Sequence, residues 1–218
     1  MNSPWNSDWL DPCLVTVLLL NFLLLGATRL KPVIYAIAAQ GIVLGLMLPI
    51  VHPGYDQRAA LLTAATVVLR GVFIPRLLFL AMRRADVRWQ VDSLIGSIPS
   101  LLFGAAGTAV ALNYADSLPL NTAHTNILVV PTALATVLTA FIILITRFKA
   151  INLVLGYMVL ENGIFIFGLL LVEAMPFLVE IGVLLDLFVG VFLMGIVIHH
   201  VAREVESTGA ESLPALRE

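Results

Sequence analysis

Seven long apolar stretches, separated by short polar segments, run through the chain. Each stretch is continuously apolar rather than alternating, which is typical of transmembrane helices and not of membrane β-strands. The predicted spans are residues 12–28, 32–51, 59–82, 93–114, 126–146, 151–172 and 176–200. No basic segment or clear cleavage site accompanies the first stretch, so it is predicted to be a retained helix. The pattern therefore predicts an all-α, polytopic membrane protein without an attached soluble domain.

Basic residues predict how the spans are oriented. Nine of the twelve follow the first, third, fifth and seventh spans: Arg29, Lys31, Arg83, Arg84, Arg88, Arg147, Lys149, Arg203 and Arg217. The opposite side receives Arg58 alone. Because cytoplasmic loops carry the excess of Lys and Arg, we expect the N-terminus outside and the C-terminus in the cytoplasm. The expected location is the inner membrane of a prokaryotic cell.

Composition excludes several classes of protein. Of the 218 residues, 60% are hydrophobic and 12% are charged, and the mean hydropathy is +1.02. An ordinary soluble domain has about 25% charged residues, so a soluble enzyme and a disordered regulator are excluded. A net charge of −2 provides no basic patch for nucleic acid. A single cysteine, Cys13, excludes a disulfide framework and a multi-cysteine iron–sulfur site, and no metal site is predicted.

Two carboxylic acids within the predicted spans are the main candidates for chemistry. Glu161 lies about ten residues into the sixth span, and Asp186 lies within the seventh, between Gly182 and Gly190. A charge at the bilayer centre costs at least about 2.5–3.5 kcal/mol, so such residues are usually functional. Burial disfavours the charged form of a carboxyl group, which suits reversible proton transfer. The alternative is a neutral carboxyl group that hydrogen bonds to a neighbouring helix and serves packing only.

Arg70 is a cation near the middle of the third span. It is too deep to reach the interface easily and needs a carboxylate, carbonyl groups or a water-filled cavity. The expected partners are Glu161, Asp186 or an acid of another subunit. A structural tether and a role in setting the charge of a relay carboxyl are equally compatible with this position. Pro75, five residues later, predicts a kink.

The remaining polar residues of the spans each have two interpretations. Glu180 is a relay member or a plain interfacial carboxylate. His199 and His200 either transfer protons at neutral pH or cap the end of the last helix. Thr132 and Thr136 are four residues apart, which is expected of a close helix contact and does not indicate a substrate.

The last three spans resemble a known family. The stretches GYMVLENGIFIFG and PFLVEIGVLLDLFVGVFLMGIVIH resemble the C-terminal half of component E of hydrogenase-4. That family is a longer relative of the small K-type subunit of bacterial respiratory complex I. By position, Glu161 and Asp186 match the two relay glutamates of the K-type subunit, with Asp in place of the second Glu. The resemblance divides the chain into an extension (1–125), a K-type three-helix unit (126–200) and a cytoplasmic tail (201–218).

The resemblance implies a non-catalytic, membrane-arm subunit of a complex I-like oxidoreductase. Its partners would be antiporter-like membrane subunits, a quinone-subunit-like membrane anchor and a peripheral hydrogenase-like arm. The nickel–iron and iron–sulfur centres would belong to those partners, and this chain would hold no cofactor. The relay residues would be Glu161, Asp186 and Glu180, with Arg70, Asn162, His199 and His200 as accessory groups.

The sequence is also compatible with other functions. The chain could be a subunit of a multi-subunit cation/proton antiporter, in which the K-type fold also occurs, or a purely structural spacer. A self-sufficient transporter is disfavoured because no internal repeat with paired broken helices is found.

Overall fold

The computed structural model describes residues 7–51, 57–84, 94–116, 128–147 and 150–171, together with Phe188 and Gly195. These segments are helical, apart from short turns, which confirms the all-α prediction. The helices are α1 (Ser7–Gly26), α2 (Leu30–Val51), α3 (Gln57–Val68), η1 (Leu69–Phe73), α4 (Ile74–Arg84), α5 (Ser97–Asp116), α6 (Val129–Thr146) and α7 (Ala150–Leu171).

Four of these helices are long and apolar enough to cross a bilayer. They are Trp9–Gly26 in α1, Leu30–Ile50 in α2, Val129–Thr146 in α6 and Ile151–Leu169 in α7. The third predicted span corresponds to α3, η1 and α4 in succession, and the fourth corresponds to α5. The seventh predicted span falls outside the described residues, except for Phe188 and Gly195. Seven spans and their orientation therefore stay predictions.

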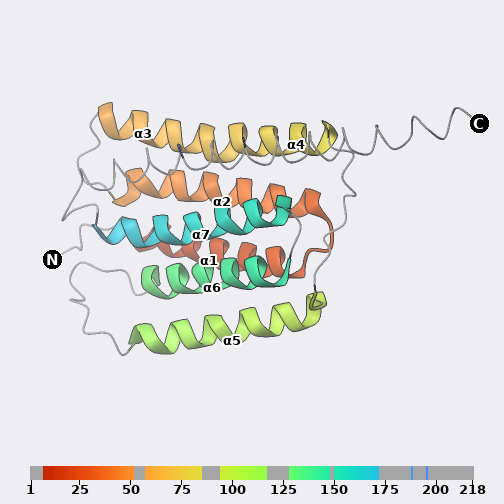
Figure 1. Ribbon diagram of the computed structural model, residues 1–218. Coiled ribbons are helices and arrows are strands. Elements are labelled where there is room, and N and C mark those ends of the chain that lie inside the picture. Colours follow the sequence, from red (N-terminus) through yellow and green to blue (C-terminus); the bar gives the residue numbers. More distant parts are fainter. Residues whose placement is uncertain are drawn as a thin grey trace, which may run out of the picture.

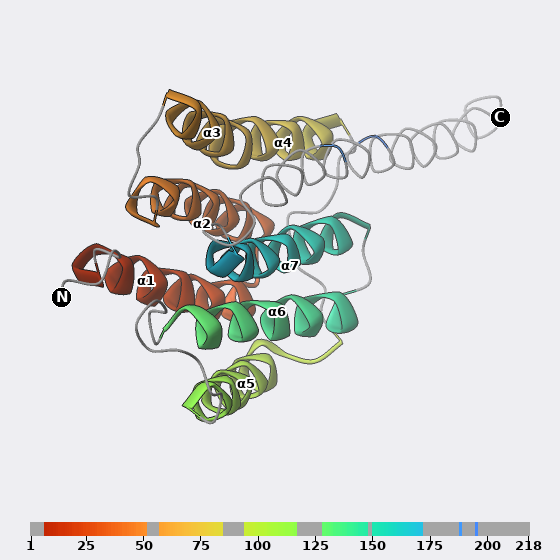
Figure 2. The ribbon, with the colours of Figure 1, turned by 90° about the vertical axis from the view of Figure 1, so that its left-hand side faces the viewer.

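The helices lie side by side in a layered bundle (Figures 1 and 2). The pairs α1–α2, α2–α7, α6–α7 and α1–α6 are in contact and form the centre of the bundle. On one flank α3, η1 and α4 pack against α2, and on the other α5 packs against α1 and α6. The described parts of the segments 1–125 and 126–200 thus contribute to one shared core.

Proline positions help to explain where three helices begin. Pro32, Pro99 and Pro131 are each the third residue of their helix. The first N–H groups of a helix have no partner within that helix, so proline is tolerated there without loss of a hydrogen bond.

Pro75 explains the local change of helix type at η1. Its ring would press on the carbonyl group of Gly71, four residues earlier, in a regular α-helix. The five residues Leu69–Phe73 instead form a π-helix, and the N–H of Ile74 donates to the carbonyl oxygen of Leu69. The wider turn relieves the conflict, and it contains Arg70.

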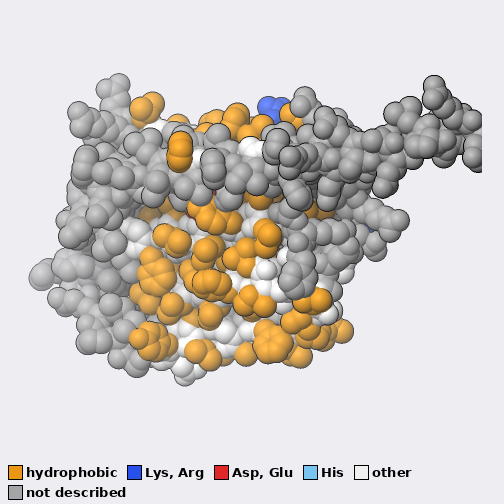
Figure 3. Space-filling view, viewed as in Figure 1, with side chains coloured by type: hydrophobic (Ala, Val, Ile, Leu, Met, Phe, Trp, Pro, Cys, Tyr) orange, Lys and Arg blue, Asp and Glu red, His pale blue; other side chains and the backbone are white. Residues whose placement is uncertain are grey.

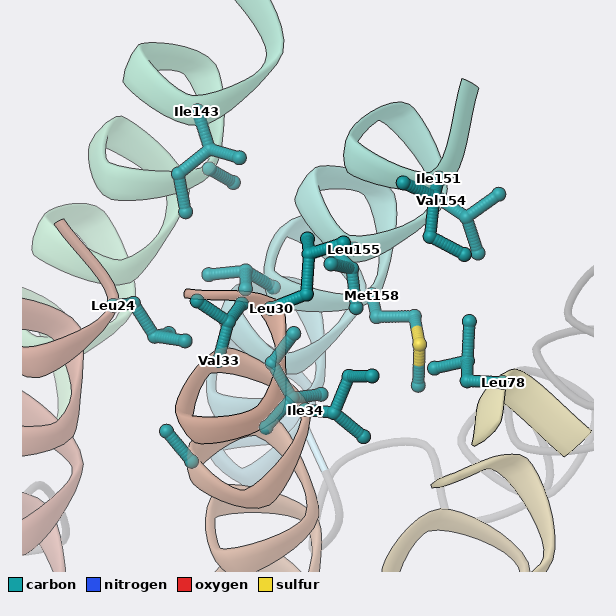
Figure 4. Close-up of a cluster of buried hydrophobic side chains, with 14 of the residues drawn as sticks. Leu24, Leu30, Val33, Ile34, Leu78, Ile143, Ile151, Val154, Leu155 and Met158 are labelled. Atoms are coloured by element: carbon teal, nitrogen blue, oxygen red, sulfur yellow. The ribbon is translucent and has the colours of Figure 1, made fainter. Parts of the chain in front are cut away.

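The core consists of two hydrophobic clusters, one toward each end of the bundle. The Leu155 cluster lies where α1 ends and α2 and α7 begin (Figure 4). It comprises Leu24, Leu25, Leu30, Val33, Ile34, Ala36, Ile37, Ile74, Leu78, Ala140, Ile143, Ile151, Val154, Leu155, Met158 and Val159. The Phe165 cluster lies toward the other end and comprises Leu10, Leu14, Val17, Leu44, Met47, Leu48, Val129, Ala133, Phe165, Ile166 and Leu169. A layer of polar side chains lies between the two clusters.

Many large hydrophobic side chains are exposed on the described surface. Hydrophobic side chains cover most of the described part of the face seen in Figure 3. On α5 the exposed large side chains are Ile98, Leu102, Phe103, Val110, Leu112 and Tyr114. A soluble protein rarely exposes so much contiguous apolar surface, whereas lipid solvates it readily. This surface supports the assignment of the chain to a membrane.

Arg147 joins helices at one end of the bundle. It follows α6, and its guanidinium Nη2 donates to the carbonyl oxygens of Leu24 and Leu25, at 2.9 and 3.5 Å. These carbonyl groups belong to the last turn of α1, where no later N–H of the helix can satisfy them. Desolvation lowers the pKa of the Arg147 guanidinium below its ordinary value. The interaction fixes the end of α6 against the end of α1.

Candidate functional site

A buried ion pair lies within the polar layer. Arg70 Nη2 lies 3.2 Å from Glu161 Oε1, and the two side chains are 8% and 6% exposed. Arg70 Nη1 donates to Asn162 Oδ1 at 2.9 Å. The guanidinium carbon also lies 4.8 Å from the centre of the Phe165 ring. One cation is therefore held by a carboxylate, an amide oxygen and an aromatic face, all from α7.

The pair lies near the middle of the apolar helices. Glu161 is ten residues after the start of the Ile151–Leu169 span and eight before its end. At 1.5 Å per residue, this places it roughly 12–15 Å from either end. At this depth the cost of an isolated charge is largest.

A chain of hydrogen bonds continues from Arg70 across the bundle. Asn162 Nδ2 donates to Gln40 Oε1 at 3.3 Å, and Gln40 Nε2 donates to Asn21 Oδ1 at 2.8 Å. Asn21 Nδ2 donates to Thr136 Oγ1 at 2.8 Å. The Thr136 hydroxyl donates to the carbonyl oxygen of Thr132 at 2.7 Å. The chain, which we call the amide relay, links η1, α7, α2, α1 and α6.

All bonds of the amide relay run in the same direction. Each amide accepts through its oxygen from the Arg70 side and donates through its nitrogen toward α6. Gln40 Nε2 also lies 3.4 Å from the carbonyl oxygen of Val17. The orientation of each amide is therefore set by its neighbours, and the relay ends on a backbone carbonyl group that cannot reverse.

A close helix contact positions Arg70. Gly41 on α2 faces it, and a Cβ atom added at Gly41 would lie 2.6 Å from the Arg70 Cβ and 3.2 Å from its carbonyl carbon. Only glycine permits this approach. The approach brings η1 close to Gln40, the residue before Gly41, and to α7. The π-helix and Gly41 together place the guanidinium against Glu161.

The two parts of the layer differ in chemistry. Glu161 can gain and lose a proton, and Arg70 is a permanent cation. Asn21, Gln40 and Asn162 carry neutral amides with no titration in the physiological range. The site can therefore hold a proton at Glu161, while the amide relay orients groups and does not store charge.

Sequence reasoning identified three residues that the structure brings together, namely Arg70, Glu161 and Asn162. Of the partners that the sequence allowed for Arg70, the structure pairs it with Glu161. Four further predicted residues lie outside the described part of the chain: Asp186, Glu180, His199 and His200. Their predicted roles stay predictions.

Sequence reasoning missed most of the amide relay. Asn21 and Gln40 were not singled out, and Thr136 was interpreted as a packing residue only. The signal was present in LLLNFLLL and AIAAQGIVLG, where one uncharged amide interrupts an apolar run. A search limited to ionisable residues passes over such positions, although an unsatisfied amide in a bilayer is also costly.

Within the described segments, no group of three or more His, Cys, Asp or Glu residues could hold a metal ion. The ion pair and the amide relay are therefore taken as the candidate site of these segments.

Comparisons with known proteins give a relative but no function. The chain is 27% identical over 205 residues to the uncharacterized protein Rv0085 of Mycobacterium tuberculosis, and the match covers 93% of each chain. No family model matches the chain, and no solved structure matches it.

Proposed function

We propose that the chain is a membrane-arm subunit of a hydrogenase-4-type, complex I-like assembly in a prokaryotic inner membrane. In this proposal Glu161 and Asp186 relay protons between a quinone-subunit-like anchor and antiporter-like subunits, with Glu180 near the outer end. The chain has seven spans, its N-terminus lies outside and its C-terminus lies in the cytoplasm. The redox centres belong to the peripheral hydrogenase-like arm.

The observation that carries this proposal is the Arg70–Glu161 pair inside a polar layer between two hydrophobic clusters. On each central helix, the polar residue lies between members of the two hydrophobic clusters. On α1, for example, Asn21 lies between Val17 of the Phe165 cluster and Leu24 of the Leu155 cluster. The described residues of the central helices above and below this layer are apolar, which disfavours a proton path straight along these helices. A lateral path to and from Glu161 is the route that this layering favours.

The surroundings of Arg70 suit a carboxyl group that must change its charge. When Glu161 accepts a proton, its attraction for the guanidinium falls. Asn162 and the Phe165 ring still hold the cation at hydrogen-bonding and cation–π distances. The cation is therefore not left without partners when the carboxylate is neutralised, which keeps the protonated state accessible.

The amide relay also favours a direction for the proton. Amides do not titrate in the physiological range, so a proton at Glu161 is not passed toward Asn21 and α6. We propose that it arrives and leaves on the flank of α3, η1 and α4, and that Asp186 is the next carboxyl.

A second candidate function is a structural spacer, because the three amides and Thr136 join four central helices and η1. In that case the pair would hold the bundle together without moving protons.

Replacement of Glu161 by Gln separates these two functions. Gln keeps the shape and a hydrogen-bonding oxygen but cannot carry a proton. We expect proton translocation to fall by at least about tenfold, with a normal amount of assembled complex. The measurement uses inverted membrane vesicles that contain the complex and a pH-sensitive dye. Asp11→Asn, near the start of α1, is the matched control and should pump normally. Undiminished pumping in Glu161→Gln would contradict the relay, and loss of assembly would favour the spacer.

A further inference from the structure

We propose that Thr136 is a positioning residue for the Arg70–Glu161 pair, although it touches neither side chain. Through the amide relay, its hydroxyl group sets how Asn162 faces Arg70, and thereby how readily Glu161 binds a proton. The inference rests on the proposed function for its biological purpose, but it concerns a titration that can be measured without transport.

Amide side chains can adopt two orientations of nearly equal shape. An Asn or Gln side chain has nearly the same shape after a half-turn that exchanges its oxygen and nitrogen. Asn162 can therefore present either an acceptor or a donor to Arg70. Only the acceptor is compatible with a guanidinium, which carries donors and no acceptor. Asn162 must therefore be kept in one of two nearly isosteric orientations.

Packing alone does not decide between these orientations, so the hydrogen bonds must do so. Asn162 is fixed by Gln40, and Gln40 is fixed by Asn21. Asn21 is fixed because its nitrogen donates to the Thr136 hydroxyl. That hydroxyl has one hydrogen, which is already donated to the Thr132 carbonyl oxygen. Toward Asn21 it can only accept, and this restriction orients Asn21. It acts together with the Val17 carbonyl oxygen, which faces Gln40 Nε2, and with Arg70, which donates to Asn162.

Removal of the Thr136 hydroxyl should loosen the far end of the relay. Asn21 would lose its acceptor, and reversed amide orientations would become populated. In a reversed relay, Asn162 directs N–H groups at the donors of Arg70, which displaces the guanidinium. A carboxylate with a less firmly held cation accepts a proton at higher pH.

Thr132 provides a matched control on the same helix. Both threonines are fully buried, and they are one turn apart. The Thr132 hydroxyl has no hydrogen-bond partner among the described residues, and only its backbone carbonyl group belongs to the relay. Thr→Val at either position removes a hydroxyl group with almost no change in volume. A packing effect should appear in both variants, and a relay effect in Thr136→Val alone.

The experiment titrates Glu161 in the full chain, reconstituted in lipid vesicles. Infrared difference spectra report the C=O stretch of the protonated carboxyl group, assigned by its loss in Glu161→Gln. In Thr136→Val we expect the midpoint of Glu161 protonation to rise by roughly 0.3–1 pH unit, as the loss of one hydrogen bond would cause. Thr132→Val should titrate like the native chain, and Thr136→Ser should restore the native midpoint.

Two outcomes would overturn the inference. One is an unchanged midpoint in Thr136→Val, and the other is an equal shift in Thr132→Val. If Thr136→Val does not fold, Thr136→Ala replaces it, because it removes the hydroxyl group and adds no volume. Failure of Glu161→Gln to reduce pumping would contradict the proposed function, but it would leave this titration and its interpretation intact.

Discussion

Replacement of Arg70 by methionine is expected to destabilise the folded chain by about 3–5 kcal/mol at neutral pH. Methionine keeps an unbranched stem of similar length but removes the guanidinium that lies 3.2 Å from the Glu161 carboxylate. The bundle then holds a carboxylate in an apolar layer without this cation. The free energy of unfolding is measured by SDS titration of the full chain in mixed micelles, followed by circular dichroism.

The pH dependence of the Arg70→Met variant has a definite sign. We expect Glu161 to keep a proton in the folded variant because its ion pair with Arg70 is lost, whereas the unfolded chain releases that proton at neutral pH. The folded state then binds more protons than the unfolded state, so the stability of the variant falls as the pH rises.

The double variant Arg70→Met/Glu161→Gln tests the cause of this loss. It removes both charges and should recover much of the lost stability, because the folded state then neither buries an unpaired charge nor has to bind a proton to avoid one. Equal stability of the single and double variants would show that the packing of Arg70 matters more than its charge.

Gly41→Ala is expected to cost about 2–3 kcal/mol, since overpacking at a close contact forces the backbone to move. The added Cβ would meet the Arg70 Cβ at 2.6 Å and the Arg70 carbonyl carbon at 3.2 Å. These are backbone-linked atoms that cannot turn away like the end of a flexible side chain. We therefore expect α2 and η1 to separate, which also moves the guanidinium away from Glu161.

Gly168→Ala is the matched control for this substitution. Gly168 also lies within an apolar helix, α7, but a Cβ added there meets no atom of the described residues within 4 Å. Its free energy of unfolding should stay the same or rise by up to about 1 kcal/mol, because alanine favours the helix over glycine. A similar loss in both variants would mean that glycine itself, and not the contact with Arg70, determines the cost at position 41.

Much of the described fold follows from the hydrophobic pattern. The first six predicted spans begin and end within five residues of the helical segments in the structure. A bilayer leaves few alternatives to a helix for an apolar segment of this length, because every backbone N–H and C=O group must be paired within the segment. The hydrophobic pattern did not predict the local change to a π-helix at Arg70, although Pro75 indicated that the helix is disturbed there.

The site was predictable only in part. Charge alone marked Arg70 and Glu161, since an ionisable residue at this depth needs a partner. Gln40 and Asn21 carried a weaker signal, and nothing in the spacing of Thr132 and Thr136 showed that one hydroxyl joins the relay while the other has no partner among the described residues. Such differences depend on which neighbouring helix faces each residue.

The sequence by itself determined that the chain is helical and apolar enough for a membrane, and that a few costly polar groups lie within its helices. Those properties depend on local composition and on the pattern of apolar residues along the sequence. Only the tertiary structure decided that Arg70 pairs with Glu161, and that three amides and one threonine continue the contact to α6. These choices depend on the packing of helices that lie far apart in the sequence. Gly41 and the π-helix η1 control that packing because they let α2 and η1 approach closely. The hydropathy of the sequence does not reveal such a contact.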